Sequence, residues 1–499
     1  MLYLSLKKGS LIMLMTLTAL AVGLETTQAQ VKNPELEALK SEIEELRRSD
    51  AEKQRKLDDL QRRIQVMEAQ PAAVEKPAAP ESALDRALKE TEPAAEQAPK
   101  TDLFSRQIGG TTFRLIDISL DALFAAGTST ERDSSIQNLE GGDHDPRRRG
   151  FTVQNIELSF SGAVDPYFTG EAHIVYLIDP VVGDTRVELE EAFLTTQALP
   201  YGLQLKGGFY FTEFGIINPT HPHAWDWLDQ PVINTRLFGP DGLRQAGVRL
   251  GWLTPLPWYS VLEVGMQNAN GETASSFFAN DEFFEERPIG GRPFVQQDVR
   301  NLGDLLYSAR WESSWDLTPA VTTKLGVSGL YGPNATGADG DTWIYGADLK
   351  LRWRPANNFR GWPFVLWQSE AMKRDYRAAA FFDDSDPDNI IDLPQQTLRD
   401  WGFYTQLLYG FRYGWAGGLR YEYASGSGES VLTFDGRRND PFRDDRHRLS
   451  PLLVWQPSEF SRIRLQYNYD RATHLENGDA HSVWLGVEFL YGAHPAHKY

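Results

Sequence analysis

The chain of 499 residues contains no cysteine. This absence excludes disulfide bonds, thiolate metal sites, a cysteine nucleophile and a lipid-modified N-terminal cysteine. Long apolar runs are also scarce, because only residues 11–24 form an extended hydrophobic stretch. A transmembrane helix needs roughly 20 apolar residues. The sequence therefore predicts no membrane-spanning helix.

The chain has fewer basic than acidic residues. Asp and Glu number 69 against 50 Lys and Arg, which gives a formal net charge of −19. Binding to nucleic acid requires a basic surface that neutralises phosphates. We therefore expect no nucleic-acid partner.

The one apolar stretch is typical of a secretory signal. It follows Lys7 and Lys8 and precedes Thr27-Gln28-Ala29, so residues 1–29 are predicted to be a signal peptide cleaved after Ala29. A membrane anchor is the less favoured alternative, because the stretch is too short. An exported chain without a lipidated cysteine suits the periplasm or the outer membrane.

Residues 30–68 are predicted to form a periplasmic coiled coil. Apolar residues recur at alternating intervals of three and four over about five heptads, the spacing of a and d positions. These positions are Leu36, Leu39, Ile43, Leu46, Leu57, Leu60, Ile64 and Met67. Asp50 and Lys53 interrupt the seam with a polar layer. A single amphipathic helix is the alternative. Residues 69–102, rich in Pro, Ala and Glu, are predicted to be a linker.

Residues 103–499 alternate between apolar and polar side chains. In residues 461–470, for example, Ile463 and Leu465 share one face, and Arg462 and Arg464 share the other. A transmembrane barrel turns its apolar face to lipid and its polar face to an interior that holds water. About sixteen such segments occur, each near the roughly 9–11 residues that a tilted strand needs. The predicted fold is therefore an all-β, about 16-stranded antiparallel transmembrane barrel preceded by an α-helical coiled coil.

Connection lengths support the barrel. Short connections alternate with long polar ones, and an even strand count places both ends of the barrel in the periplasm. The short connections are expected at residues 165–166, 199–202, 254–258, 316–319, 355–361, 411–415 and 456–460. The long ones are expected at residues 128–150, 215–243, 270–301, 376–396 and 425–445. Trp and Tyr near strand ends, such as Tyr201, Trp258 and Tyr491, suit the aromatic girdles of such barrels.

Residues 215–243, after the fifth strand, are unusually apolar for a loop. We expect this loop to fold into the barrel and narrow it, as the corresponding loop does in trimeric porins. A packed lid without contact to solute is the alternative. The constriction candidates are His221, His223, Trp225, Asp226, Asp229, Arg236 and Asp241.

Charges on the inward faces predict an acidic and a larger basic arc. Opposed charges across a narrow channel favour small polar solutes, and the basic excess suggests mild anion preference. Pairing among the charges, without selectivity, is the alternative. The pore-lining candidates are Asp117, Asp121, Glu157, Glu171, Lys206, Arg249, Arg310, Lys324, Lys350, Arg352, Arg354, Arg420, Arg462 and Arg464.

Catalysis and cofactor binding have little support. Ser425-Gly426-Ser427-Gly428 does not match a nucleophile elbow, and no Ser, His and carboxylate grouping stands out. His221-Pro222-His223 is a weak metal signal without a third ligand nearby in sequence, so a structural or pore-lining role is preferred. We expect no enzymatic activity, cofactor or bound metal.

The chain resembles the porin O and P type, the phosphate-selective porins. The resemblance covers residues 104–499 and rests on the sixteen-strand pattern, Phe193 before a turn and a Gly-rich strand, the loop after strand five and the aromatic C-terminus at Tyr499. Residues 218–226 and 457–462 resemble an uncharacterised subgroup of outer-membrane proteins that are sometimes labelled zinc-regulated receptors. The resemblance implies a homotrimer. It does not extend to phosphate selectivity, because the loop has only Arg236 and no arginine ladder or lysine cluster can be placed.

These patterns together predict an outer-membrane porin, a passive channel for ions and small hydrophilic solutes. Its expected partners are outer-membrane lipid, lipopolysaccharide, the barrel-assembly machinery and two further copies of itself. A TonB-linked importer is less favoured, because only a coil and a linker precede the barrel, without room for a plug domain. A metal-regulated receptor and a structural barrel that links the envelope layers remain alternatives.

Overall fold

The computed structural model describes residues 105–492, apart from 109–110, 115, 140, 180–182, 389, 432, 435–436, 439 and 441. The predicted signal peptide, coiled coil and linker and the C-terminal Tyr499 lie outside the described residues. No helix in the described part of the chain is long and apolar enough to cross a membrane.

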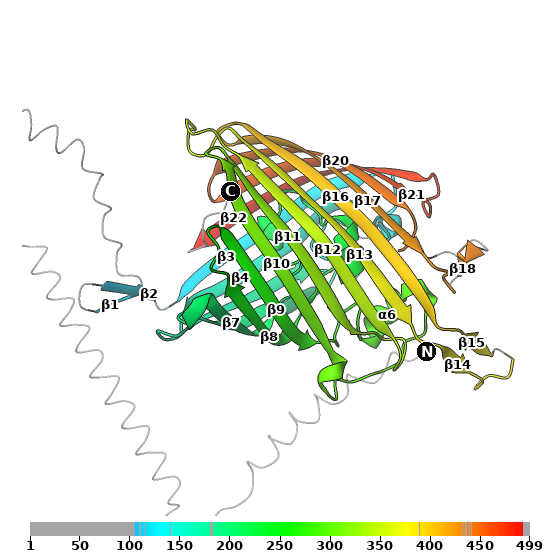
Figure 1. Cartoon of the computed structure of the whole chain (residues 1–499). Helices are drawn as coiled ribbons and strands as arrows, with labels where there is room; N and C mark the ends of the chain where they lie inside the picture. The colour runs from blue at the N-terminus through cyan, green and yellow to red at the C-terminus, as the bar shows by residue number, and fades with distance from the viewer. Residues whose placement is uncertain are drawn as a thin grey trace, which may run out of the picture. The chain divides into compact units, whose positions relative to one another are not determined.

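Within the described residues, sixteen antiparallel strands close into one barrel (Figure 1). Each barrel strand pairs with the barrel strands that precede and follow it along the chain, and β22 pairs with β3 to close the ring. The barrel strands are β3 (Asp117–Ser129), β4 (Gly150–Ala163), β5 (Phe168–Ile178), β6 (Thr185–Thr196), β7 (Leu203–Phe211), β8 (Arg244–Leu253), β9 (Tyr259–Asn268), β10 (Leu305–Thr318), β11 (Val321–Pro333), β12 (Asp341–Trp353), β13 (Phe364–Ala378), β16 (Gln396–Arg412), β17 (Trp415–Ser427), β20 (Arg446–Ser458), β21 (Ser461–Ala472) and β22 (Asp479–Gly492). The predicted all-β class and the sixteen strands are confirmed.

Short elements lie outside the barrel ladder. In the part of the chain that the structure describes, three hairpins pair β1 (Ser105–Ile108) with β2 (Thr111–Arg114), β14 (Phe381–Asp383) with β15 (Ile391–Leu393), and β18 (Thr433–Phe434) with β19 (Arg437–Arg438). Among the described residues, the helices are α4 (Asp133–Gln137), α5 (Val232–Phe238) and α6 (Asp281–Glu286), and the 3₁₀ turns are η1 (Pro200–Gly202), η2 (Pro222–Ala224), η3 (Ile289–Gly291) and η4 (Leu302–Asp304). The sequence shows no helical period after residue 102, because helices of five to seven residues are too short to display one.

The two faces of the wall differ as alternation predicts. On β21 the side chain of Leu465 is 46% exposed, whereas the inward Arg464 is 0% exposed. Leu465 pairs with Leu453 of β20 and Leu485 of β22, so apolar side chains continue across strands on the outside. Tyr201, Trp258 and Tyr491 are exposed near strand ends, as expected for girdle residues. An apolar exterior around a charged interior is the pattern of a transmembrane barrel.

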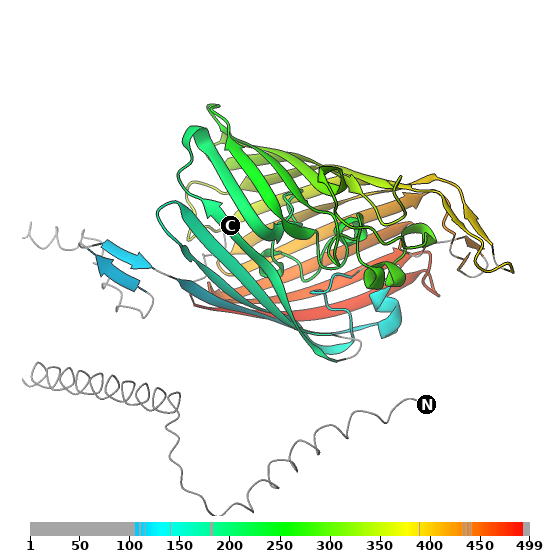
Figure 2. The same cartoon turned by 90° about the horizontal axis from the view of Figure 1, so that it is seen from below.

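The interior has two unlike halves. Toward the long connections it holds a hydrophobic core, in which residues of the β7–β8 and β9–β10 connections pack against inward wall residues such as Leu330, Ile344 and Met372. Toward the short turns the inward residues of β11 and β12 are charged, as at Lys324 and Lys350. On β13 to β20, by contrast, Trp227 packs with apolar wall residues such as Phe364 and Leu408 in a second hydrophobic cluster. Figure 2 shows the helical and irregular green segments of these connections lying between the walls.

Candidate functional site: the lumen and its inward segment

The inward segment, residues 212–243, connects β7 to β8 and lies inside the barrel, as predicted for residues 215–243. Its backbone N–H groups need partners once they leave water. Carboxylates of the wall accept them: Glu370 of β13 accepts from Ile216 and Ile217, and Glu422 of β17 accepts from Val232 at 2.6 Å. Wall contacts on β13 and β17 therefore hold the segment along its length.

The indole of Trp227 and the amide that follows it extend these contacts to two more strands. Trp227 donates from Nε1 to the Ser450 carbonyl of β20 at 3.0 Å, and the Leu228 amide donates to Gln466 of β21 at 2.8 Å. Trp227 is almost fully buried. The segment thus spans the lumen from β7 and β8 to the wall opposite.

Asp229 is the electrostatic centre of the segment. Arg420 of β17 and Arg448 of β20 form ion pairs with it, and Gln466 and Asn468 of β21 donate to it at 2.7 and 2.8 Å. Burial opposes ionisation of Asp229, but Arg420 and Arg448 outweigh burial and hold the pKa of its carboxyl below the ordinary range. An ionised Asp229 therefore ties the segment to three strands.

Arg462 and Arg464, predicted to line the pore, lie inside the barrel but are buried. Both pair with Glu488 of β22, at 2.7 and 2.5 Å. Arg464 also donates to the carbonyls of Trp225 and Trp227, at 2.9 and 3.0 Å. These arginines, like Arg420, support the inward segment rather than face open water.

The remaining constriction candidates occupy different surroundings. Trp225 is buried and donates to the Thr220 carbonyl. Arg236 donates to the Asp444 carbonyl at 2.9 Å, and Asp241 pairs with Arg244. Asp226 is half-buried and interacts electrostatically with Lys350 of β12. Of these candidates, Asp226 is therefore the one that interacts with the charged wall of β12 near the short turns.

Charged side chains on β7 to β12 form a paired network around the short-turn half. Arg249 pairs with Glu213 and Glu263, and Arg310 pairs with Asp348 at 2.6 Å and Glu312 at 2.9 Å. Pairing among the inward charges, the alternative to a selective pore lining, thus describes much of this region. The residues of the predicted pore lining that are only partly buried are Asp117, Glu171, Lys206, Lys324, Lys350, Arg352 and Arg354; Asp121, Glu157, Arg249 and Arg310 are buried.

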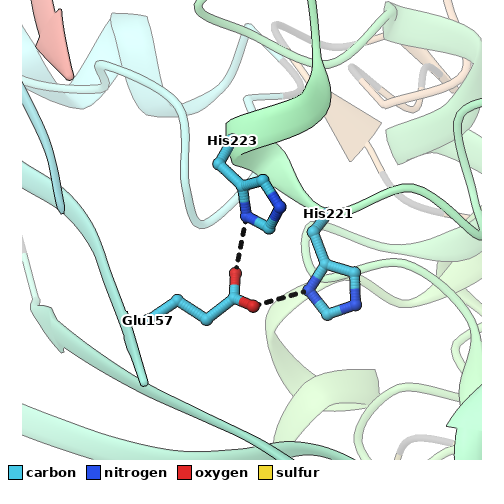
Figure 3. Close-up of side chains that lie close together, drawn as sticks. All are labelled: Glu157, His221 and His223. Atoms are coloured by element: carbon cyan, nitrogen blue, oxygen red, sulfur yellow. Dashed lines mark hydrogen bonds and ion pairs between the residues drawn. The ribbon is translucent and has the colours of Figure 1, made fainter. Parts of the chain in front are cut away.

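Histidines gather where the inward segment meets β4, β5 and β6. His223 Nδ1 is 2.9 Å from Glu157 Oε2, and His221 Nδ1 is 3.3 Å from Glu157 Oε1 (Figure 3). His173 of β5 also contacts Glu157, at 2.9 Å. Burial lowers the pKa of both loop histidines, but Glu157 outweighs it, aided by Glu190 at His221, and the pKa of each is raised.

Sequence reasoning identified His221, His223 and Glu157 separately but did not bring them together. Glu157 and His223 are 66 positions apart, and only the pairing of β4, β5 and β6 places Glu157, His173 and Glu191 side by side. It also missed Glu370 and Glu422, whose role is to accept loop amides. Their inward position on alternating strands was a visible signal, but which loop they would meet was not.

The chain is similar in sequence to a known protein. An uncharacterized protein of Aquifex aeolicus (strain VF5) is 30% identical over 414 residues, which cover 77% of this chain and 80% of that protein. The chain belongs to the family of that protein. No family model matches it.

Solved barrels of similar form belong to outer-membrane channels. The outer membrane channel DcaP of Acinetobacter baumannii aligns over 75% of this chain and 97% of its own, with 12% identity and a TM-score of 0.46. An anion-selective porin from Comamonas acidovorans aligns over 75% and 100%, with 8% identity and a TM-score of 0.44. Both TM-scores lie below 0.5. The fold of this chain is therefore established by its own strand pairing.

Proposed function

We propose that the protein is an outer-membrane porin, a passive channel for small hydrophilic solutes with a narrow, loop-lined constriction. The observation that carries the proposal is the contrast between the two faces of one closed barrel, with exposed Leu465 and Leu485 outside and charged side chains inside. A barrel that only anchored the chain would not need a charged interior that includes partly exposed side chains.

The constriction is proposed to lie between the inward segment and the wall of β11 and β12. Asp226 faces this region from the segment, and Lys324, Lys350 and Arg352 stand on the wall. Lys324 pairs with Glu312 at 2.7 Å, yet 38% of its side chain is exposed. Paired but accessible charges around a narrow passage favour small polar solutes, and the basic residues support a mild preference for anions.

Planar-bilayer recordings of the purified protein test the channel. We expect discrete conductance steps in KCl, and a reversal potential in a KCl gradient that indicates modest anion preference. Deleting residues 219–234 removes the central half of the inward segment and should increase the single-channel conductance. The matched control deletes residues 384–390, the tip of the β14–β15 hairpin, and should leave conductance unchanged. Unchanged conductance after the first deletion would reject the constriction.

A structural barrel that links the envelope layers is the second candidate, and the packed core inside the lumen favours it. Phe214, Val232, Leu237 and Phe277 are almost completely buried there. Absence of any conductance would favour this structural role. Solute uptake that requires the proton-motive force would instead favour an energised importer.

We also propose, from the resemblance and the predicted coil, that the protein is a homotrimer of the porin O and P type. The periplasmic coil, residues 30–68, would join the three barrels beneath the membrane.

A further inference from the structure

Three histidines and three glutamates form one buried cluster beside the inward segment. The six residues are His173, His221, His223, Glu157, Glu190 and Glu191. Glu157 is 0% exposed, and His223 and Glu190 are buried as well. The members come from β4, β5 and β6 and, in the inward segment, from η2 and the residue before it, so the cluster joins the wall to the segment. With neutral imidazoles, three carboxylates would share this enclosed space.

The contacts around His221 are more numerous than its protons can satisfy. Nδ1 lies 2.8 Å from Glu190 Oε2 and 3.3 Å from Glu157 Oε1, while Nε2 lies 2.8 Å from Glu191 Oε2. Within the described chain, neither Glu190 oxygen nor His221 Nδ1 makes a hydrogen bond of acceptable geometry. A buried carboxylate without hydrogen bonds is costly, so this arrangement favours a further cation among these atoms.

Imidazole nitrogens and a carboxylate oxygen, the atom types that bind transition metals, lie close together in the cluster. Glu157, His221 and His223 each offer one ligand atom, and the three atoms all lie within 4.8 Å of one another. Imidazole nitrogen and carboxylate oxygen bind Zn²⁺ at about 2.0–2.2 Å, which places neighbouring ligand atoms about 3.3 Å apart in a tetrahedral site. His223 Nδ1 lies 2.9 Å from Oε2 of Glu157, and His221 Nδ1 lies 3.3 Å from Oε1, so each nitrogen is near that separation from one of the two carboxylate oxygens.

His221 is also oriented as metal-binding histidines usually are. Such a histidine donates its second ring N–H to a carboxylate, which fixes the tautomer and leaves the other nitrogen free to bind. Here Nε2 can donate to Glu191, and Nδ1 then points to Glu157 and Glu190. A second group, His173, Glu191 and His221, shares the same imidazole. A neutral imidazole has one free lone pair, so the two groups compete for it.

We propose that Glu157, His221 and His223, with Glu190 adjacent, bind one divalent transition-metal ion of the zinc class. Two histidines, one glutamate and an additional oxygen make a set that suits Zn²⁺. The bound ion would join η2 of the inward segment to β4 and β6 of the wall. Glu171, whose side chain is 42% exposed, lies beside His173 at the solvent-accessible edge of the cluster. The site does not depend on the protein being a channel.

Metal titration of the folded, full-length protein tests the site. Zn²⁺ binding is followed by calorimetry and Co²⁺ binding by visible absorption, and we expect saturation near one ion per chain. His223→Gln and Glu157→Gln should each weaken binding at least tenfold. His481→Gln is the matched control, because His481 lies in β22 on the exposed outer face beside Tyr467. Failure of the wild type to bind saturably, or equal binding by wild type and both cluster variants, overturns the proposal.

A measurement on the wild type guards against variants that do not fold. X-ray absorption of the zinc-loaded protein should show two imidazole nitrogens and carboxylate oxygen as ligands. A shell of oxygen atoms alone, or with one imidazole, overturns the assignment and leaves protonated histidines paired with glutamates as the account of the cluster. Conductance is not part of this readout, so a failed channel proposal and a failed metal proposal remain distinguishable.

Discussion

At the scale of single residues, the lumen is stabilised by a few buried charges with many partners. Asp229 pairs with Arg420 and Arg448 and accepts from Gln466 and Asn468. Burying an ion pair is favourable only when its geometry and additional hydrogen bonds compensate for lost hydration. Here each arginine also has a second carboxylate, Glu422 for Arg420 and Asp470 for Arg448.

We expect Asp229→Ala to lower the free energy of unfolding by about 3–5 kcal/mol, because it leaves two buried arginines undercompensated. Urea unfolding in detergent micelles, followed by tryptophan fluorescence, measures the change. Asp384→Ala is the control, since Asp384 is exposed in a loop and surface changes of this kind shift stability by about 0.5 kcal/mol or less. Equal midpoints for the two variants would contradict the central role of Asp229.

A second residue-scale prediction concerns pH. His144, in the β3–β4 connection, has acceptors at both ring nitrogens: the Gln154 carbonyl at 3.3 Å and Asp241 at 3.2 Å. Burial lowers the pKa of His144, but the hydrogen bond and charge of Asp241 outweigh it and raise the pKa to about 9. The unfolded value is about 6.5, so this contribution to stability is fully present below pH 6.5 and is lost as pH rises through 9.

Wild type should therefore lose more stability than His144→Gln between pH 6 and 9.5. Unfolding midpoints of both proteins at several pH values give this difference. The contributions of other titrating groups cancel in the comparison, because both proteins share them. Parallel pH profiles would show that His144 is not protonated in the folded state.

At the scale of elements, the strands follow from the sequence and the inward segment follows only in part. Apolar and polar side chains alternate on β21 because each faces lipid or lumen, and that local rule was enough to predict sixteen strands. The apolar content of residues 215–243 predicted packing inside the barrel. The partners of that segment, such as Glu370 and Ser450, could not be predicted, because they depend on the closure and register of distant strands.

The outward face of β21 gives an element-scale test. Leu465 lies near the middle of its strand, between Leu453 and Leu485 on neighbouring strands. Leu465→Arg should reduce stability in lipid vesicles by about 2–4 kcal/mol, the cost of an arginine near the bilayer midplane. Folding is measured by gel mobility and tryptophan fluorescence across a urea series. Glu476→Arg, in the exposed β21–β22 connection, should cost far less. Comparable effects would mean that β21 does not face lipid.

At the scale of the whole molecule, one closed barrel wall has an apolar outer face and a polar inner face. Pairing of β22 with β3 removes free strand edges, which a barrel in lipid requires because unpaired backbone groups cannot be satisfied there. The long connections then fill one half of the lumen, and charged side chains such as Lys324 and Lys350 line the wall of β11 and β12 in the other half. Both barrel termini, the start of β3 and the end of β22, lie at the short-turn end.

The predicted coiled coil is a testable determinant of oligomeric assembly. Deleting residues 36–67 removes the predicted a and d positions, and we expect it to weaken the proposed trimer, since those positions would supply the apolar seam between helices. Native gels and light scattering in detergent report the oligomer. Deleting residues 69–100 removes the same length of chain but leaves the seam, and should preserve trimers. Replacing Asp50 and Lys53 with leucine should strengthen them, because it removes the polar layer. Unchanged trimers after the first deletion would assign the coil another task, such as contact with the cell wall.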